Sequence, residues 1–239
     1  MTPLGAAEAA GYRYVGSELA IFEKAVHWKR YWSGKIRPFV SGDVLEVGAG
    51  IGANTRLLAP GMPYRSWTCL EPDASLAAQI CPPGSGIHAV CGTVADLPPA
   101  ASFDSILYID VLEHIEDDRA EMARASALLK RAGHLIVMSP AHQFLYSPFD
   151  SAIGHFRRYS RKTLAGVVPS QLRLRLLAYL DAAGMLASLA NRVLLNQSMP
   201  KENQILLWDR VLVPVSRVID PLCAGRVGKN VLGVWQRVN

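Results

Sequence analysis

The chain has 239 residues, half of them hydrophobic, a net charge of +5 and a pI near 9.1, which suits one large α/β domain or one domain with an appended cap. No charged-then-apolar leader and no uninterrupted apolar run of about 20 residues stands in the sequence, so it predicts neither a secreted nor a membrane-spanning protein. The four cysteines lack CxxC or metal-type spacing and favour a reduced, cytoplasmic protein.

Residues 18–39 carry apolar and aromatic side chains at helical spacing, which predicts one or two helices that end near Pro38. Tyr31 is one of these aromatic residues. We expect them to pack in the core or to form a lid over a binding site, where Tyr31 could contact a substrate.

A short apolar run, residues 44–47, ends abruptly in Gly48, Gly50 and Gly52. This pattern predicts a buried strand followed by a tight glycine turn and a helix from Ala53. Alternate glycines let the backbone adopt conformations that side chains forbid and let a ligand approach it closely. The turn therefore predicts a nucleotide-like ligand above the end of a strand.

The same strand–helix–strand spacing continues along the chain and predicts an α/β fold with a doubly wound, Rossmann-like, mostly parallel sheet. Further strands are predicted over residues 66–70, 88–91, 103–110, 134–138, 172–180 and 231–238, and helices over 53–59, 74–80 and 118–130. Residues 141–163 show little periodicity and predict an ordered functional loop. Residues 184–228 predict a helical insertion within a single domain of residues 1–239, with Trp208, Leu212 and Val215 on one face.

Acidic residues follow three of these strands. Glu71 ends the second strand, where it could accept hydrogen bonds from both ribose hydroxyls of a nucleoside. Asp96 follows the third and could accept a hydrogen bond from an exocyclic amine. Glu46, just before the glycines, suits a ligand with a positive centre better than a pyrophosphate, which favours an amino-acid nucleoside over a dinucleotide.

These features resemble class I S-adenosylmethionine-dependent methyltransferases over about residues 40–140. The resemblance implies a seven-stranded sheet whose last strand is antiparallel, with S-adenosyl-L-methionine as cofactor. It also implies that Glu46 and the glycines face the methionine part, Glu71 the ribose and Asp96 the adenine. The cofactor residues it implies are Glu46, Gly48, Gly50, Gly52, Glu71, Pro72, Asp96, Leu97, Ile109 and Asp110.

A second segment, Gly-His-Phe-Arg-Arg-Tyr at residues 154–159, is similar to one bacterial branch of that superfamily, as is Gly-Lys-Asn at 228–230. We place the acceptor site in this region. His155 and Tyr159 are the candidate catalytic bases, because histidine titrates near neutral pH. The substrate-binding candidates are Tyr31, His114, His142, His155, Arg157, Arg158 and Tyr159. Each has a structural alternative: His114 could cap a helix, and the two arginines could pair with Asp150 or Glu113 instead of binding an anionic acceptor.

The leading hypothesis is therefore methyl transfer, by in-line displacement, to a small-molecule or lipid- or sugar-linked metabolite. Oxygen is the favoured acceptor atom, with nitrogen and carbon as alternatives. The alternatives are an NAD-dependent oxidoreductase and a nucleoside-binding accessory protein at a membrane surface. We expect no metal, since Asp104, Asp117 and Asp118 resemble strand-edge and helix-start acids. We expect no nucleic-acid partner, and the insertion could contact a membrane surface or a second copy of the chain.

Overall fold

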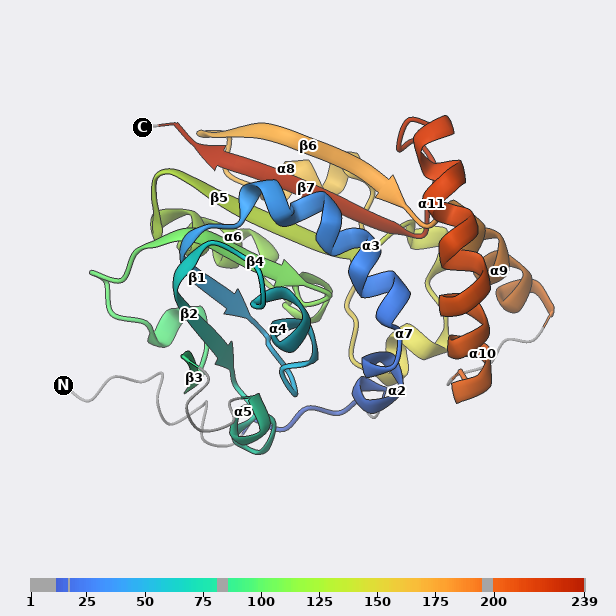
Figure 1. Cartoon of the computed structure of the whole chain (residues 1–239), viewed down its shortest axis with the longest axis horizontal. Helices are drawn as coiled ribbons and strands as arrows, with labels where there is room; N and C mark the ends of the chain where they lie inside the picture. Colours follow the sequence, from blue (N-terminus) through green and yellow to red (C-terminus); the bar gives the residue numbers. More distant parts are fainter. Residues whose placement is uncertain (1–11, 17, 81–85, 195–199, 239) are drawn as a thin grey trace.

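The computed structural model describes residues 12–16, 18–80, 86–194 and 200–238 (Figure 1). Its centre is a seven-stranded sheet in the order β3-β2-β1-β4-β5-β7-β6. All neighbouring strands run parallel except β7, which is antiparallel to both β5 and β6. The predicted doubly wound sheet with an antiparallel last strand is thus confirmed. The strands are β1 Gly42–Val47, β2 Tyr64–Glu71, β3 Ile87–Cys91, β4 Phe103–Ile109, β5 Leu129–Pro140, β6 Leu172–Leu180 and β7 Asn230–Arg237.

Helices cover both faces of the sheet. They are α2 Leu19–Glu23, α3 Val26–Ile36, α4 Ala53–Leu58, α5 Ala74–Ile80, α6 Asp118–Ala127, α7 Pro148–Ala152, α8 Arg161–Val167, α9 Ala182–Leu194, α10 Glu202–Leu207 and α11 Val213–Leu222. Short 3-10 turns span Arg37–Phe39, Val94–Asp96, Leu112–His114 and Gln143–Leu145, and a π-helical turn, Trp208–Leu212, joins α10 to α11.

Two hydrophobic cores separate along the strands with the period of two that a pleated sheet imposes. Val44 and Leu107 pack on one face with α3, α4 and α5, whereas Leu45 and Ile106 pack on the other with α6 and α8. Both cores are closed to solvent. The carboxyl ends of the parallel strands are therefore left as the edge at which a ligand can bind.

The expected helix over residues 118–130 ends three residues early. The prediction placed strand β5 from His134, but the strand begins at Leu129, which pairs with Phe103 of β4. Lys130 turns toward the start of the sheet, where its ammonium contacts Asp43 and lies 3.0 Å from Asp104. This long-range ion pairing overrides the local signal for a helix end.

The expected loop over residues 141–163 is ordered, as predicted, but it also contains helix α7 and the start of α8. Both begin with a capping box, in which a serine and a residue three positions later bond each other's backbone. Ser147 pairs in this way with Asp150, and Ser160 with Thr163. The sequence carries these capping boxes, although the helices they start are too short to show periodicity.

Helices α9, α10 and α11 gather at one end of the sheet, between β6 and β7 in the chain (Figure 1). The expectation that Trp208, Leu212 and Val215 share one face is wrong. Trp208 is buried against Trp28 of α3, with ring centroids 5.7 Å apart, whereas Val215 is 43% exposed. The π-helical turn shifts the phase between α10 and α11, and so separates these side chains.

Buried carboxylates fasten these helices to the sheet. Asp220 of α11 accepts hydrogen bonds from the amides of Asp181 and Ala182 at 2.7 and 2.9 Å, and from the hydroxyl of Tyr31 at 2.8 Å. Asp209 accepts from the amides at the start of α3. In the described ranges, none of the helices combines the length and apolarity needed to cross a membrane.

Candidate functional site

Four parallel strands end at one edge of the sheet with a glycine or an acid. Gly48 follows β1, Glu71 ends β2, Asp96 lies in the turn after β3, and Asp110 follows β4. The structure thus brings together the predicted cofactor residues, because neighbouring parallel strands end on the same side.

The glycine turn after β1 has left-handed backbone geometry at three positions. The φ angles of Gly48, Gly50 and Gly52 are +63°, +57° and +74°, a region costly for residues with a Cβ atom. A Cβ atom on Gly48 would also lie 2.6 Å from a methyl group of Val111, after β4. The turn therefore requires glycine both for its backbone and for its contact with the neighbouring strand end.

Glu71 ties this turn to the end of β2. Its Oε2 accepts a 2.8 Å hydrogen bond from the amide of Gly50, and its Oε1 accepts one of 3.0 Å from the amide of Asp73, two residues along, after Pro72. Burial raises the pKa of Glu71, and these two amides oppose the rise. Each carboxylate oxygen has a second lone pair, which a ribose hydroxyl could use.

Asp96 lies in the next turn along the edge. Its Oδ2 accepts 2.8 Å hydrogen bonds from both the amide and the hydroxyl of Thr93, which holds the carboxylate in place while leaving it exposed. Leu97 beside it is half-buried, and Ile109 of β4 belongs to the core. An exposed carboxylate that is held in place could accept a hydrogen bond from the edge of a base. The apolar side chain beside it could pack against the face of the same base.

Glu46 lies beneath the turn. It is 2% exposed, and its Oε2 accepts hydrogen bonds from the hydroxyl of Thr55 in α4 at 2.8 Å and from the indole of Trp67 in β2 at 2.9 Å. Burial raises the pKa of Glu46 to about 7, against these two hydrogen bonds. This acid therefore joins the turn to α4 and β2, and its contact with the methionine part of a ligand stays a prediction.

Asp110 directly follows β4 at this edge of the sheet. It is exposed to solvent and has a φ of +57°. Desolvation by the surrounding protein raises its pKa to about 7, opposed by the charges of Lys229 and Lys29. Asp110 is therefore an accessible acid at the strand ends, where it can meet a ligand.

Lys229, just before β7, is a charged residue whose charge acts on Asp110. Sequence reasoning did not select it. Its Nζ lies 3.8 Å from the centroid of the Trp208 ring and 3.5 Å from Oδ2 of Asp181. Burial lowers the pKa of Lys229, opposed by the carboxylate of Asp181. The signal that could have found it is the Gly228-Lys229-Asn230 segment, whose place in space the sequence does not give.

His114 and His155 come together although they lie far apart in the chain. Their rings are 4.5 Å apart, edge to face, and Nε2 of His155 lies 3.8 Å from Oε1 of Glu113. Burial and the charge of His155 lower the pKa of His114 to about 3. Burial and the charge of Asp110 raise the pKa of Glu113 well above its usual value.

Both arginines have structural partners, but only Arg158 takes one of the two expected from the sequence, Asp150. Arg158 forms a bidentate pair with Asp150, at 2.7 and 2.8 Å, and Arg157 lies 2.8 Å from Oδ2 of Asp118. The hydroxyl of Tyr159 also donates to Asp118, at 2.6 Å, on the face of the sheet covered by α6 and α8. These side chains hold the 154–159 segment against the strand ends.

Two further substrate candidates also have structural partners. Tyr31 donates to Asp220 and connects α3 to α11. The ring of His142, whose φ is +66°, lies 4.5 Å from that of Tyr179, and its Nε2 is 3.1 Å from the backbone oxygen of Gly228. His142 therefore lies next to Gly228, at the start of the segment that contains Lys229.

Tyr14 and Leu19 lie over the strand ends. The amide of Tyr14 donates to Asp73 at 2.8 Å, and its ring lies 5.7 Å from that of His114. Side-chain atoms of Leu19 in α2 are 3.7 Å from where a Cβ atom on Gly50 would be. These two residues form a lid, whereas Tyr31 and Trp32 of the segment expected to form the core or a lid are buried in the core.

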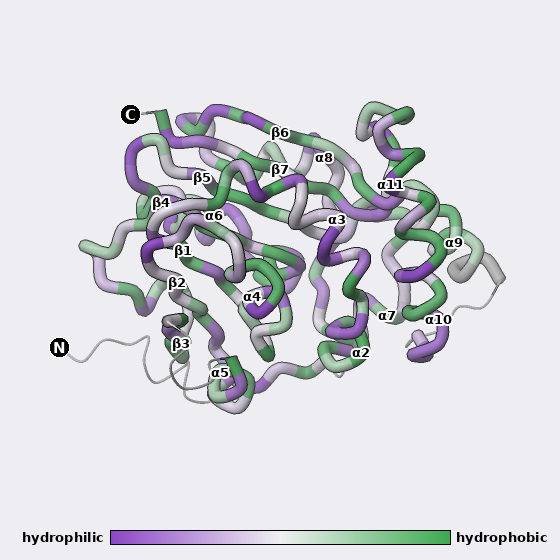
Figure 2. Tube along the Cα trace, viewed as in Figure 1, coloured by the Kyte–Doolittle hydropathy of each residue, from purple (hydrophilic) through white to green (hydrophobic). Residues whose placement is uncertain are grey.

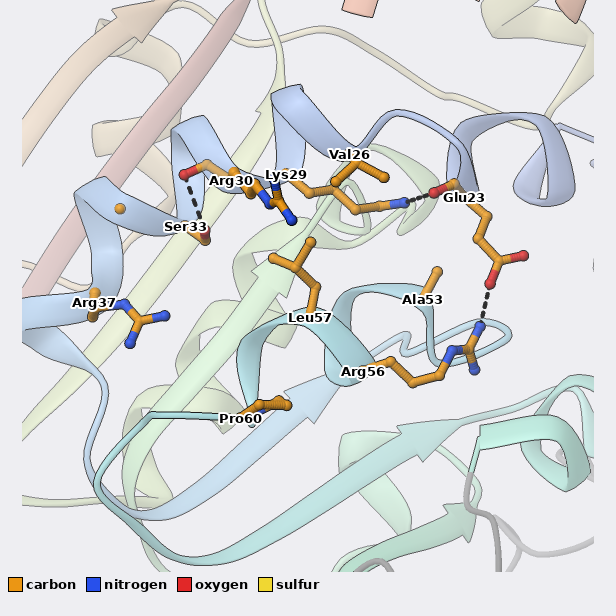
Figure 3. A pocket seen from close by; sticks show the side chains of 11 residues that line it. Glu23, Val26, Lys29, Arg30, Ser33, Arg37, Ala53, Arg56, Leu57 and Pro60 are labelled. Carbon is orange, nitrogen blue, oxygen red and sulfur yellow. Dashed lines mark hydrogen bonds and ion pairs between the residues drawn. The ribbon is translucent and has the colours of Figure 1, made fainter. Parts of the chain in front are cut away.

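A separate groove of about 570 Å³ lies between α3 and α4 (Figure 3). Most of its basic side chains already have partners: Lys29 donates to the backbone oxygen of Glu23, Arg56 pairs with the Glu23 carboxylate, and Arg37 donates to the backbone oxygen of Gly61. The groove contains none of the strand-end acids. The chemistry of the site therefore lies at the sheet edge.

The edge fits a nucleoside that carries a cationic amino-acid tail. The glycine turn exposes backbone, Glu71 and Asp96 offer fixed carboxylates, and Glu18, buried next to Leu19 in the lid, has an Oε2 without a hydrogen-bond partner among the described residues. A buried carboxylate oxygen of this kind is stabilised by an ammonium group. The ligand groups that these protein groups could bind are a ribose, a base and an ammonium group, and S-adenosylmethionine contains all three.

Comparisons with known proteins agree with this geometry. The model of a family described as "Methyltransferase domain" matches residues 21–179, more than half of the chain. Demethylmenaquinone methyltransferases of two Tropheryma whipplei strains, Twist and TW08/27, are each 30% identical over 152 residues. That alignment covers 62% of this chain, and the chain spans 62% of the length of these curated relatives.

Among solved structures, the N-methyltransferase NodS from Bradyrhizobium japonicum WM9 is 15% identical, with a TM-score of 0.56 over 93% of this chain and 99% of that one. A second structure of NodS contains S-adenosyl-L-homocysteine. A SAM-dependent methyltransferase from Archaeoglobus fulgidus is also 15% identical, with a TM-score of 0.59 over 92% of this chain and 100% of that one. At these identities the likeness shows a shared fold.

The family model spans both the glycine turn and the 154–159 segment, and the sheet has the strand order and the antiparallel strand that the resemblance implied. The chain therefore belongs to the methyltransferase domain family, and its fold is shared with solved methyltransferases.

Proposed function

We propose that the chain methylates a hydroxyl oxygen of a small molecule that is attached to, or dissolved in, a lipid surface. The observation that carries the choice of oxygen is Asp110. It is accessible, it lies directly after β4 beside the glycine turn, and its pKa of about 7 lets it take up a proton near neutral pH. A hydroxyl acceptor must lose a proton as it is methylated, and a base whose pKa is close to the working pH serves this step best.

The cofactor residues act by holding and orienting. Glu71 would bind the ribose hydroxyls and Asp96 the base, while the backbone around Gly50 lets the ligand approach closely. S-adenosylmethionine supplies a methyl group that its positively charged sulfur already activates. The protein therefore contributes mainly alignment of the acceptor oxygen and exclusion of water, which can lower the barrier by about 7–11 kcal/mol.

Lys229 and the lid would complete the acceptor site. The charge of the Lys229 ammonium acts on Asp110, and Lys229 would bind a polar or anionic group of the acceptor. Tyr14 and Leu19 cover the strand ends from the other side. Together they would fix the acceptor and keep bulk water from the reacting oxygen.

The lipid part of the proposal comes from helix α11, whose apolar face is turned outward. Val215, Val218 and Leu222 of α11 recur at helical spacing with Val211 of the π-helical turn before it, and the four are 43%, 67%, 82% and 49% exposed in this order. The polar residues Ser216 and Asp220 point inward instead and are buried. An amphipathic helix normally buries its apolar face, so this one offers an apolar stripe to a partner.

The neighbouring surface favours a membrane as that partner. Leu186 of α9 and Leu207 of α10 are also more than 60% exposed. Figure 2 shows hydrophobic stretches along α9 and α11. Arg210 and Arg217 are exposed among them. Aliphatic side chains flanked by arginines suit the boundary between headgroups and acyl chains of an anionic bilayer.

Methyl transfer from radiolabelled S-adenosylmethionine tests the oxygen assignment. Lipid-linked acceptors with a free hydroxyl should be labelled, and the same acceptors with that hydroxyl already methylated should not. Asp110→Asn should lower kcat by at least about 100-fold, whereas Asp104→Asn, at the other end of β4, should retain the wild-type rate. Labelling of the blocked acceptors, or full activity in Asp110→Asn, would rule out the proposed chemistry.

Vesicle co-sedimentation tests the lipid assignment. Vesicles with phosphatidylglycerol should sediment the wild-type chain, and Val218→Asp with Leu222→Asp should abolish this while leaving the melting temperature unchanged. Sedimentation that the double variant retains, or a stable dimer without vesicle binding, would contradict it. The dimer would assign the stripe to a second copy of the chain.

A further inference from the structure

Three side chains from two segments converge next to the turn that follows Asp110. Glu113 and His114, in the turn after β4, and His155, in the segment after α7, each place one potential ligand atom within 4.8 Å of the other two. Glu113 and His155 are buried, and His114 is half-buried. Carboxylate oxygen and imidazole nitrogen are both ligands of divalent transition metals.

Glu113 has an unused ligand atom. Its side chain is fully buried, and the hydroxyl of Ser139 donates to Oε2 at 2.9 Å. The other oxygen, Oε1, has no hydrogen-bond partner among the described residues and lies 3.8 Å from Nε2 of His155. Leaving a buried carboxylate oxygen unpartnered is costly. A proton or a bound cation would neutralise this atom.

His155 is oriented toward that oxygen from behind. Its Nδ1 is 2.9 Å from Oδ1 of Asp150, which is itself fully buried and held by a bidentate pair with Arg158. A carboxylate that binds the rear nitrogen of a histidine and fixes the front nitrogen is the usual second layer of a metal site. Nε2 is thereby directed into the space that Glu113 faces.

His114 is the third member. Its ring contacts the His155 ring edge to face, with centroids 4.5 Å apart, and the Tyr14 ring lies 5.7 Å from it. Hydrogen bonds fix the other two candidate ligands, Glu113 through Ser139 and His155 through Asp150.

We propose that Glu113, His114 and His155 bind a divalent transition-metal ion. Two imidazoles and one carboxylate favour zinc, cobalt, iron or manganese over calcium and magnesium, which prefer all-oxygen sites. Three protein ligands leave coordination positions open, as in metal sites that bind a substrate oxygen. The expectation of no metal rested on Asp104, Asp117 and Asp118. The sequence does not show that His155 meets Glu113 and His114, because it stands far along the chain from them.

Glu113 lies in the turn Leu112–His114, three residues after Asp110, so the site adjoins the place proposed for the acceptor. If the acceptor is a hydroxyl, as proposed above, the ion would lower the pKa of that hydroxyl. This role rests on the proposed function, whereas metal binding itself does not.

Metal titration of the chelator-treated full chain tests the site. Calorimetry with zinc, and visible absorption with cobalt, should each report one bound ion per chain, with the cobalt bands of a nitrogen–oxygen ligand set. Glu113→Gln and His155→Ala should each weaken binding by about 100-fold or more. His88→Ala, an exposed histidine on β3, should bind as the wild type does.

Two further measurements separate the possible failures. Both cluster variants should bind S-adenosyl-L-homocysteine like the wild type, which shows that they fold and that the cofactor edge is intact. Zinc that binds the wild type no more tightly than it binds Glu113→Gln would overturn the site. A bound ion whose removal leaves methyl transfer unchanged would overturn its role toward the acceptor and leave the proposed function standing.

Discussion

The amide of Gly50 donates a 2.8 Å hydrogen bond to Oε2 of Glu71. This bond joins the glycine turn of β1 to the tip of β2, so the carboxylate assigned to the ribose also fixes the backbone that the methionine part would approach. Glu71 is 5% exposed and cannot leave this position without breaking the contact. Cofactor binding and the shape of the turn are therefore coupled through one side chain.

The first prediction concerns the backbone of that turn. Gly50→Ala should destabilise the chain by about 1–2 kcal/mol, because alanine is strained at a φ of +57° although the space for its methyl group exists. Affinity for S-adenosyl-L-homocysteine should fall with it. Chemical denaturation and calorimetry measure the two effects.

Gly34→Ala is the matched control for this substitution. Gly34 lies inside helix α3, its φ is not positive, and nothing would lie within 4 Å of an added Cβ atom. Alanine there should leave stability unchanged or raise it by up to about 1 kcal/mol. Equal effects of the two substitutions would show that the turn has no special backbone requirement.

The second prediction concerns pH and Glu46. Its pKa is about 7 in the folded chain because it is buried, and an unfolded glutamate has its ordinary pKa of 4.5. The folded state therefore holds a proton that the unfolded state has lost between these values, and stability falls as pH rises from about 4.5 through 7. The full difference corresponds to about 3 kcal/mol.

Glu46→Gln should remove this dependence while keeping both hydrogen bonds, because the single oxygen that accepts from Thr55 and Trp67 is retained as the amide oxygen. The variant should be more stable than the wild type at pH 8 and no more stable at pH 4.5. Denaturation curves at the two pH values measure this. Exposed Glu202→Gln should show no such pH effect, and a constant difference between Glu46→Gln and the wild type would disprove the buried-acid argument.

The third prediction concerns the anchor of the helical insertion. Asp220→Ala should cost about 3–5 kcal/mol, since it leaves the buried amides of Asp181 and Ala182 and the hydroxyl of Tyr31 without their acceptor. Tyr31→Phe removes only one of the three bonds and should cost about 1 kcal/mol. Similar losses in the two variants would mean that the amides find other acceptors.

Most of the fold could be predicted from the sequence, because the strands that carry it are short, apolar and bounded by glycine, proline or acidic residues. The error at β5 shows the limit of such patterns. Leu129 is a strand residue because it pairs with Phe103, and Lys130 points toward Asp43 and Asp104. The local signals for a helix end depend on neighbouring residues alone. They therefore could not predict that β5 begins at Leu129.

The cofactor edge was also predictable, since residues that follow successive parallel strands must meet. The acceptor side was not. The Asp150–His155 contact, the pairing of Arg158 and the position of Lys229 above Trp208 all depend on how the 141–163 segment and the helical insertion fold back over the sheet. The sequence supplied the residue types, and only the structure shows which of them face one another.

The most direct measurement is calorimetric titration of the chain with S-adenosyl-L-homocysteine, alongside a fluorescence titration with NADH. We expect one molecule of the nucleoside to bind, no binding of NADH, and about 10- to 100-fold weaker binding in Glu71→Ala, because hydrogen bonds to a charged group are lost. Glu202→Ala, on the exposed side of α10, should bind like the wild type. NADH binding without nucleoside binding, or an unchanged affinity in Glu71→Ala, would contradict the assignment of this edge to the methyl donor.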